Sequence, residues 1–404
     1  MPAGNLETLK IAILYGADAV YIGGDAYSLR AKADNFSSDA MREGIAFAHR
    51  YGRRVYVTAN IFAHNGDLSG IRRYFVELRD IHPDGVLVAD PGVFVLAKEL
   101  LQDIPIHIST QANTTNALSA RFWVAQGAKR IVAARELSMT ELKAIREELP
   151  PQAEIEVFVH GAMCISYSGR CLLSNYFTGR DANKGACTHP CRWKYALEEE
   201  TRPGEYLPVE ETERGTFIMN SKDLCMVGHI QELLEAGVDS LKVEGRMKSM
   251  LYVATTARAY RQAIDDCMAS VERYRQRLDW YIQEVEACTN RTFTTGFFFG
   301  KPSGETMIYD ASTYVVGCTY LGFVEGERRI DGRVCYRVMQ RNKLSVGEEI
   351  EIMSPSGENA SAVVLHLYDE EGKIVDSVPH AKQIFYLDVG MPLEQYVVLR
   401  RREQ

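Results

Sequence analysis

The feature of this sequence most suggestive of chemistry is a group of five cysteines between residues 164 and 225. Its members are Cys164, Cys171, Cys187, Cys191 and Cys225, whereas the other four cysteines of the chain are widely scattered. An odd total of nine cysteines and an N-terminus without a signal-peptide pattern argue against a disulfide framework. Thiolates that converge from neighbouring loops are instead typical of a metal centre.

The spacing of these cysteines leaves three interpretations open. Four thiolates are the usual ligands of a 4Fe-4S cluster, and tetrahedral thiolate sites also hold zinc. No Cys-x-x-Cys pair is repeated here, so structural zinc has no special support. Small residues such as Gly161, Ala162 and Ser168 lie among the first cysteines, which leaves room for backbone NH groups near cluster sulfurs. The third interpretation is a set of buried, inert thiols.

Charged residues near position 244 form a second candidate site. Lys242, Glu244 and Arg246 alternate along a predicted strand, so their side chains would share one face. Charges inside a barrel near its strand ends suggest a dicarboxylate or phosphate site, and the alternative is an internal salt-bridge ladder. The predicted catalytic residues are His160, Glu244 and Arg246, and the predicted substrate-binding residues are Gln111, Arg170, Lys242 and Arg246. His160 is equally well explained as a structural hydrogen-bonding residue.

A basic stretch interleaved with aromatic residues surrounds the cysteine loops. The cations are Arg170, Arg180, Lys184, Arg192 and Lys194, and the aromatic residues are Tyr167, Tyr176, Phe177 and Trp193. The whole chain carries a net charge of −8, so any nucleic-acid site must be a local patch of this kind. An RNA backbone could approach these cations while a flipped base stacks on an aromatic ring. The alternatives are a solvated loop and ordinary core packing.

Conventional protease motifs are missing from the sequence. None of the nine histidines is followed by Glu, and no Gly-x-Ser-x-Gly occurs. A cysteine protease would need a low-pKa thiolate beside a histidine, for which only Cys164 near His160 and Cys187 near His189 qualify. Both cysteines are better explained as neighbours of a cluster.

Short β-branched runs alternate with amphipathic segments from the start of the chain to about residue 250. The predicted strands span 18–24, 54–60, 84–90, 106–111, 129–134, 155–160 and 240–245, with 216–220 as a further candidate. Such a series favours a parallel sheet, and no Gly-x-Gly-x-x-Gly follows a strand. We therefore predict an α/β fold, a TIM-type (β/α)8 barrel whose active site lies at the C-terminal ends of the strands.

The rest of the chain predicts flanking helices and a second domain. Residues of about 249–290 are helical in pattern and would complete the first domain, residues 1–300. Residues 306–404 alternate like short strands, at 313–323, 334–339, 348–353, 362–368, 384–388 and 396–399, and predict a small antiparallel β-barrel. The chain opens directly into a helix, which predicts a missing lead-in strand. The terminal run Arg400 to Arg402 would support contact with a nucleic acid.

Composition sets the broad class of protein. The chain has 404 residues, 46% of them hydrophobic and 25% charged, as is usual for a globular protein with a large core. No apolar run approaches the roughly 20 residues that a membrane span requires. We therefore expect a cytoplasmic protein without a membrane partner.

The cysteine region resembles a known family. Segments 156–164 (EVFVHGAMC) and 169–174 (GRCLLS) match the signature of the collagenase-like peptidase family, peptidase family U32, at about a dozen positions. The resemblance continues through 220–225 (NSKDLC), 242–248 (KVEGRMK), 295–297 (TGF) and 300–302 (GKP). In length and in its C-terminal domain the chain is similar to the bacterial tRNA wobble-uridine hydroxylation proteins of that family.

This resemblance implies a function and a set of ligands. It implies oxygen-independent conversion of uridine to 5-hydroxyuridine near a 4Fe-4S cluster, with prephenate as co-substrate and tRNA as partner. The implied ligands are Cys164, Cys171, Cys187 and Cys225, with Cys191 as an alternative to Cys225. A paralogous subunit of the same family is a further candidate partner. Two other functions stay open, namely a collagenase-like peptidase and a non-enzymatic RNA-binding module.

Overall fold

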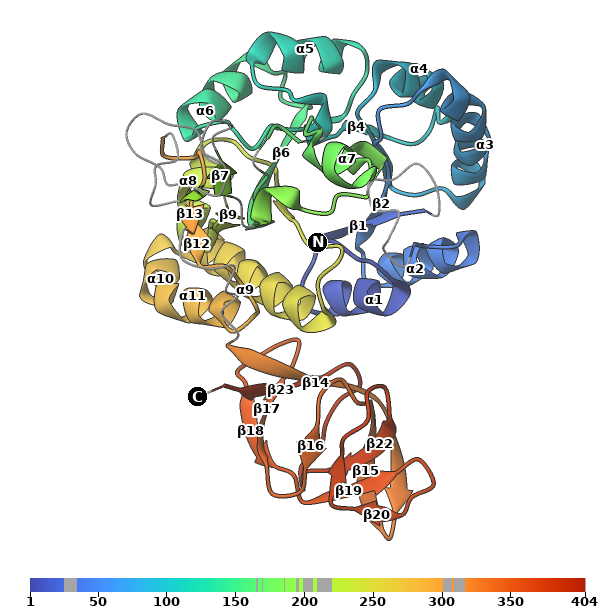
Figure 1. The fold of residues 1–404 in the computed structure, drawn as a ribbon, viewed down its shortest axis with the longest axis vertical. Coiled ribbons are helices and arrows are strands. Elements are labelled where there is room, and N and C mark those ends of the chain that lie inside the picture. The colour runs from blue at the N-terminus through green and yellow to red at the C-terminus, as the bar shows by residue number, and fades with distance from the viewer. Residues whose placement is uncertain are drawn as a thin grey trace.

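The computed structural model contains two large β-sheets with helices between them (Figure 1). It describes residues 1–24, 35–164, 166–168, 170–184, 186–193, 196–198, 206–208, 220–300, 307–308 and 317–403. In Figure 1 the first part, blue to yellow, is a ring of helices around a sheet, and the second part, orange to red, is built of strands.

Seven parallel strands form the wall of the first part. They are β1 (Ala19–Gly23), β2 (Arg54–Ala59), β3 (Gly85–Val88), β4 (Ile106–Ile108), β5 (Arg130–Val132), β6 (Glu154–Ala162) and β11 (Ser240–Val243), paired in that order. Their side chains are almost all buried, as strands covered on both faces require. This confirms the predicted α/β barrel and places its strand ends within a few residues of the predicted ones.

Helices follow the strands and cover them from outside. They are α1 (Leu6–Leu14), α2 (Ser38–Arg50), α3 (Asn65–Ile81), α4 (Pro91–Leu100), α5 (Ala117–Ala125), α6 (Met139–Glu148), α8 (Ile230–Glu235) and α9 (Met250–Ala269). Most begin at a short polar cap, such as Asn5 or Ser249, whose side chain accepts a backbone NH of the first turn. Gly16 and Gly237 follow α1 and α8 with positive φ, which favours glycine at a helix end.

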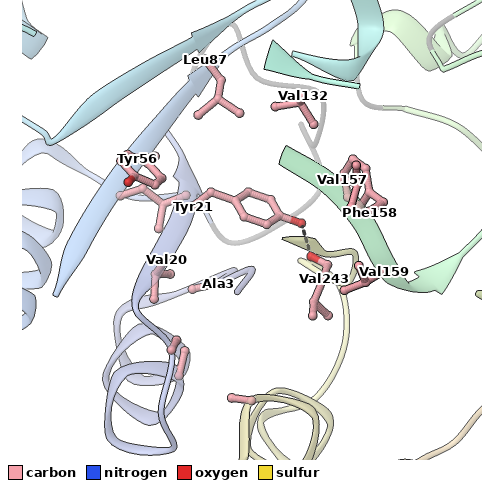
Figure 2. Close-up of a cluster of buried hydrophobic side chains, with 14 of the residues drawn as sticks. Ala3, Val20, Tyr21, Tyr56, Leu87, Val132, Val157, Phe158, Val159 and Val243 are labelled. Carbon is pink, nitrogen blue, oxygen red and sulfur yellow. Dashed lines mark hydrogen bonds between the residues drawn. The ribbon is translucent and has the colours of Figure 1, made fainter. Parts of the chain in front are cut away.

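The first three residues occupy the place between β11 and β1. Pro2 forms a parallel bridge with Tyr21, and the Tyr21 NH donates to the Met1 carbonyl. The Tyr21 hydroxyl then donates to the Val243 carbonyl at 2.8 Å, across from β1 to the end of β11 (Figure 2). Residues 1–3 thus extend the sheet beside β1 by one short bridge.

The sheet departs from the predicted all-parallel series in one region. The strand β10 (Asp223–Cys225) pairs antiparallel with the end of β6, and β12 (Phe293–Thr294) pairs with β10. Of the candidate strand 216–220, residues 216–219 lie outside the described residues, and Asn220–Ser221 forms β9 with β13 (Met307–Ile308) instead. Such short strands carry no periodicity of their own, so their pairing is set by the surrounding fold.

The predicted helical stretch is present and flanks the barrel. It consists of α9 with the shorter α10 (Val271–Gln276) and α11 (Leu278–Glu286), and α9 is buried on all sides from Met250 to Tyr260. Among the described residues, no helix is long and apolar enough to span a membrane.

The second part is an antiparallel sheet that curls into a half-barrel. Its strands are β14 (Cys318–Ile330), β15 (Arg333–Met339), β17 (Glu349–Met353), β18 (Ala360–Val363), β19 (His366–Asp369), β20 (Ile374–Val375), β22 (Ile384–Asp388) and β23 (Val398–Arg402). They pair in the order β18-β17-β23-β14-β15-β22-β19-β20. The predicted strand 362–368 is two strands, β18 and β19, in different places of this sheet.

Candidate active site at the mouth of the barrel

The cysteine loop begins where β6 leaves the barrel. Cys164 follows Ala162 by two residues, so the loop starts at the C-terminal end of the parallel strands. Phe62, just after β2, exchanges backbone hydrogen bonds with the Asn183 side chain at 3.0 and 3.2 Å. These bonds hold the loop to the far side of the same barrel end. The loop therefore lies over the mouth, where active sites of barrel enzymes occur.

A short helix, α7 (Leu173–Thr178), runs between the cysteines of this loop. Figure 1 shows it inside the ring of outer helices. The Ser174 hydroxyl accepts the Thr188 backbone NH at 3.0 Å and lies 3.1 Å from the Thr188 hydroxyl. This contact brings the segment after Cys187 back to the start of α7, two residues beyond Cys171.

Cys171 and Cys187 lie close enough to Cys164 to act on its thiol electrostatically. Desolvation raises the pKa of the Cys164 thiol even though the residue keeps an exposed surface, and negative charge on Cys171 and Cys187 raises it further. The Ser166 backbone and the Arg135 guanidinium oppose that rise. Among the described residues, no three His, Cys, Asp or Glu side chains are arranged to hold a metal ion. The donor set fits an iron-sulfur cluster in its chemistry, since thiols are the ligands such clusters take.

The two candidates for the fourth ligand lie in different places. Cys191 is part of a short 3-10 turn, Pro190–Arg192, in the same loop as Cys187. Cys225 lies on β10, where its sulfur is 3.9 Å from the Tyr260 hydroxyl and burial raises its pKa to about 11. The choice between the two stays a prediction. The four cysteines outside the loops, Cys267, Cys288, Cys318 and Cys335, are buried.

Arg135, which the sequence did not single out as a site residue, connects β5, β6 and β11 at the mouth. Its guanidinium donates to the Ala162 carbonyl and to the Glu244 carboxylate, both at 3.0 Å. Glu244 and Arg246 lie beyond β11, which ends at Val243 after an irregularity in its pairing. Arg246 is buried, and its guanidinium lies 3.5 Å from the Thr58 hydroxyl of β2. Arg135 could have been predicted as a site residue from the sequence, because it lies just after a predicted strand.

Lys242 points into the barrel and is held there by β6. Its ammonium donates to Glu156 at 2.5 Å and lies 4.4 Å from the centre of the Tyr21 ring. Arg130 bonds the other oxygen of Glu156 at 2.8 Å. Burial would raise the pKa of Glu156, but these two cations hold it well below its usual value. Lys242 thus forms an internal salt bridge, although with Glu156 and not with Glu244, and its role in substrate binding stays a prediction.

His160 lies between the sheet and α9. Its ring centre is 5.4 to 5.8 Å from those of Tyr252, Tyr260 and Phe293, and only 3% of the residue is exposed. Burial lowers its pKa to about 4, so it is neutral near pH 7. This placement accords with a structural role, and its catalytic role stays a prediction.

Three buried polar atoms near the strand ends have no hydrogen-bond partner among the described residues. They are Asn60 Oδ1 after β2, Gln111 Oε1 after β4 and Arg135 Nε after β5. A buried polar atom without a partner is costly, and binding sites are where such atoms are commonly satisfied by a ligand. The role of Gln111 in substrate binding stays a prediction.

The basic and aromatic residues of the loop face outward. Arg170 and Arg180 are exposed, and the Arg170 guanidinium lies 4.3 Å from the centre of the Phe62 ring. Tyr167, Tyr176, Phe177 and Trp193 are between 45% and 83% exposed, so core packing is not their role. Lys194 and the side chains of Lys184 and Arg192 lie outside the described residues.

A pocket of about 510 Å³ opens at the opposite end of the barrel. Arg54, Asp84, Pro105 and Lys129, which lie at or just before the starts of β2 to β5, are among its lining residues. Barrel enzymes carry out their chemistry at the other end, so this pocket is not the candidate active site.

Comparison with known proteins agrees with this architecture. The family model of Peptidase family U32 matches residues 4–308, and that of the Peptidase family U32 C-terminal domain matches residues 317–400. The tRNA hydroxylation protein P1 of Bacillus subtilis (strain 168) is 41% identical over 389 residues, which cover 96% of this chain and 91% of the relative.

Two further relatives extend the comparison. The tRNA hydroxylation protein P of Escherichia coli (strain K12) is 36% identical over 99% of this chain and 95% of its own. The tRNA hydroxylation protein P2 of Bacillus subtilis (strain 168) is 34% identical over 74% of this chain and 96% of its own. The chain belongs to peptidase family U32.

Proposed function

We propose that this protein hydroxylates RNA, and specifically converts the wobble uridine of tRNA to 5-hydroxyuridine. The observation that carries the proposal is a sequence identity of 36% and 41% to two proteins named for tRNA hydroxylation, over nearly the whole of both chains. It is supported by a thiol-rich, basic loop that closes over the end of a parallel barrel. Proteolysis requires no such combination.

The proposed cofactor is a 4Fe-4S cluster. Cys164, Cys171 and Cys187 would hold it together with Cys225 or, in its place, Cys191. When bound, such a cluster supplies one-electron chemistry that side chains lack. The sequence contains neither His-Glu-x-x-His nor Gly-x-Ser-x-Gly, which argues against the peptidase alternative.

The protein's own residues would bind and orient the reactants. Prephenate, the proposed co-substrate, carries two carboxylates, and the buried Arg246 offers a guanidinium for one of them. Arg135 fixes the position of Glu244 through a 3.0 Å ion pair. The unpartnered amide oxygen of Gln111 could accept a hydrogen bond from a hydroxyl or from the uracil NH.

We place this activity in the cytoplasm, where tRNA is found. Bacillus subtilis carries two relatives of this chain, P1 and P2. A second subunit of the same family is therefore the protein partner to test, by co-purification from the native organism.

The test is nucleoside mass spectrometry of tRNA from a deletion strain. We expect 5-hydroxyuridine and its derivatives to fall, and blocking prephenate synthesis to mimic that loss. Restoring the gene should restore the nucleoside, whereas an Arg246→Ala version should not. The Arg246→Ala protein should keep its fold and its iron. It should lose the contact between the Arg246 guanidinium and a carboxylate of prephenate, which contributes roughly 1.5 to 3 kcal/mol to binding.

Two results would contradict the proposal. Unchanged 5-hydroxyuridine in a strain that also lacks every paralogue would remove the RNA hydroxylase function. Gelatin cleavage by the pure protein that disappears in a Cys164→Ala variant would establish the peptidase alternative.

A further inference from the structure

The helix α7 exposes aromatic side chains at the mouth of the barrel. Tyr176 is 83% exposed, and Phe177 and Trp193 are each 45% exposed. The ring centres of Tyr176 and Phe177 are 5.2 Å apart, and those of Phe177 and Trp193 are 6.0 Å apart. We call these three residues the α7 aromatic face. They form a continuous row of rings turned toward solvent.

The opposite side of α7 shows that this orientation is built into the loop. Ser174 is fully buried, and its hydroxyl bonds to Thr188. The helix thus packs against the loop through a small polar residue and leaves its large apolar ones outside. This reverses the usual amphipathic arrangement, and a clustered exposed apolar surface is typical of a binding site.

The charge of the loop selects the kind of ligand. Residues 164–193 contain four Arg or Lys and one Asp, a net charge of +3, so the rest of the chain carries −11. Arg170 and Arg180, on either side of α7, are both exposed. Aromatic rings combined with cations bind unpaired nucleotides, because the bases stack on the rings while the phosphates meet the cations. A protein partner would not require this local reversal of charge.

We infer that the α7 aromatic face is a stacking platform for unpaired bases of an RNA loop. It would hold nucleotides next to the target base while that base enters the barrel mouth beside Cys164. The inference rests on the proposed function, since it assigns the RNA to the same mouth. It adds the residues that grip the RNA and the requirement that its loop be single-stranded.

The test is binding of the full-length protein, purified without oxygen, to a synthetic RNA hairpin with 2-aminopurine in its uridine-containing loop. We expect binding to quench the fluorescence of 2-aminopurine by stacking, and an RNA duplex of equal length to bind far more weakly. Tyr176→Ala should weaken hairpin binding by roughly 5- to 100-fold and remove the quenching. Tyr176→Phe should retain both, because it keeps the ring.

Two control variants separate stacking from other effects. Phe122→Ala removes an aromatic side chain that is 55% exposed on α5, outside the basic loop, and should bind like the wild type. Arg180→Gln should weaken binding and reduce the slope of log K against log salt by about 0.7, one phosphate contact to a single strand.

Several outcomes would overturn the inference. These are a wild-type protein that does not bind the hairpin, equal binding of the duplex, or a Tyr176→Ala variant that binds and quenches like the wild type. Loss of a dimer or of a paralogous subunit in Tyr176→Ala, with RNA binding intact, would assign the face to a protein partner. The proposed function is tested separately in the deletion strain. If 5-hydroxyuridine is unchanged there while RNA bases still stack on the α7 aromatic face, the proposed function fails and the inference stands.

Discussion

Cys164 lies where its thiolate is disfavoured unless another group stabilises it. The surrounding protein and the neighbouring thiols raise its pKa, and Arg135 offsets this only in part. A bound metal centre would stabilise the deprotonated form, so that metal binding releases protons. Cys164 is therefore suited to be a ligand of a metal centre.

The first prediction concerns the metal content of cysteine variants. Protein purified without oxygen should carry about four irons and four sulfides per chain, as a 4Fe-4S cluster requires. Cys171→Ala should lose them, whereas Cys335→Ala, at a buried position on β15 in the second domain, should not. Comparing Cys191→Ala with Cys225→Ala then identifies the fourth ligand. Stoichiometric zinc without sulfide, or full iron in all the loop variants, would contradict the assignment.

The second prediction concerns pH and His107. This residue is 3% exposed, and burial and Arg130 lower its pKa to about 3. The folded state keeps His107 neutral while the unfolded state takes up a proton below about pH 6.5. The contribution of neutral His107 to the free energy of unfolding is therefore complete above pH 6.5. It falls as the pH drops toward 3, by roughly 2 to 3 kcal/mol down to pH 4.

The measurement for His107 is the free energy of urea unfolding between pH 7 and 4. His107→Gln should flatten the decline, whereas His380→Gln, at an exposed position, should leave it unchanged. The comparison uses slopes, so a variant that is less stable at every pH still answers the question. Equal slopes for the wild type and His107→Gln would refute the prediction.

At the scale of elements, β6 organises the barrel interior and the site together. Its Glu156 bonds Lys242 of β11 and Arg130 of β5, and its end leads to Cys164. A buried carboxylate with two cations is stable only while all three groups are present, because an uncompensated buried charge is costly. Strand β6 therefore ties its two neighbours together through charge as well as through backbone pairing.

The third prediction orders three variants by the charge that each leaves behind. Glu156→Gln leaves the buried Lys242 cation without its carboxylate, whereas Arg130 keeps its second partner Glu154, and should cost about 3 to 5 kcal/mol of unfolding free energy. Lys242→Met should cost less, because Arg130 still pairs Glu156. Glu99→Gln, in an exposed surface pair with Arg72, should leave the free energy of unfolding almost unchanged. Denaturant unfolding measures all three, and equal costs for the first and the last would contradict the argument.

The sequence predicted the elements whose pattern is local. Each main barrel strand is a β-branched run followed by an amphipathic helix, and all seven were found near their predicted positions. The pairing of β10 could not be predicted, because three residues show no period and their partner on β6 lies about sixty residues earlier. Lys242 was placed in a possible salt-bridge ladder, but its partner Glu156 comes from another strand.

The site was predictable in its residue types and less so in its geometry. Strand ends with polar residues located the mouth, and Gln111 and Arg246 do lie near it. The anchoring of the cysteine loop depends on Phe62 and Asn183, which are 121 residues apart and carry no recognisable motif. Such long-range contacts follow from the folded arrangement and leave no signal in one sequence.

At the scale of the whole molecule, buried charges hold the two domains together. Arg400 on β23 is fully buried and bonds Glu284 of α11 and Glu351 of β17 at 3.0 and 2.5 Å. Glu284 also pairs Arg258 of α9 at 2.7 Å. The prediction that Arg400 contacts a nucleic acid is therefore wrong, since a terminal run of arginines looks like surface until its partners are known.

The fourth prediction follows from the different surroundings of two nearby arginines. Both Arg400 and Arg402 pair Glu351, but the Arg402 side chain is 56% exposed and the Arg400 side chain is completely buried. Arg400→Met removes a cation shared by the buried Glu284 and the half-buried Glu351, so it should cost about 3 kcal/mol and loosen the domain contact. Arg402→Met should cost below about 1 kcal/mol, because the Arg402 side chain is solvated and Glu351 keeps its pair with Arg400. Hydrogen exchange of the full chain measures both effects. Faster exchange in α9, α11 and β23 is expected for Arg400→Met alone, while β3 and β4 on the far side of the barrel should keep their protection. Unchanged exchange in α9 and α11 would show that the apolar contact between the domains suffices without this charge network.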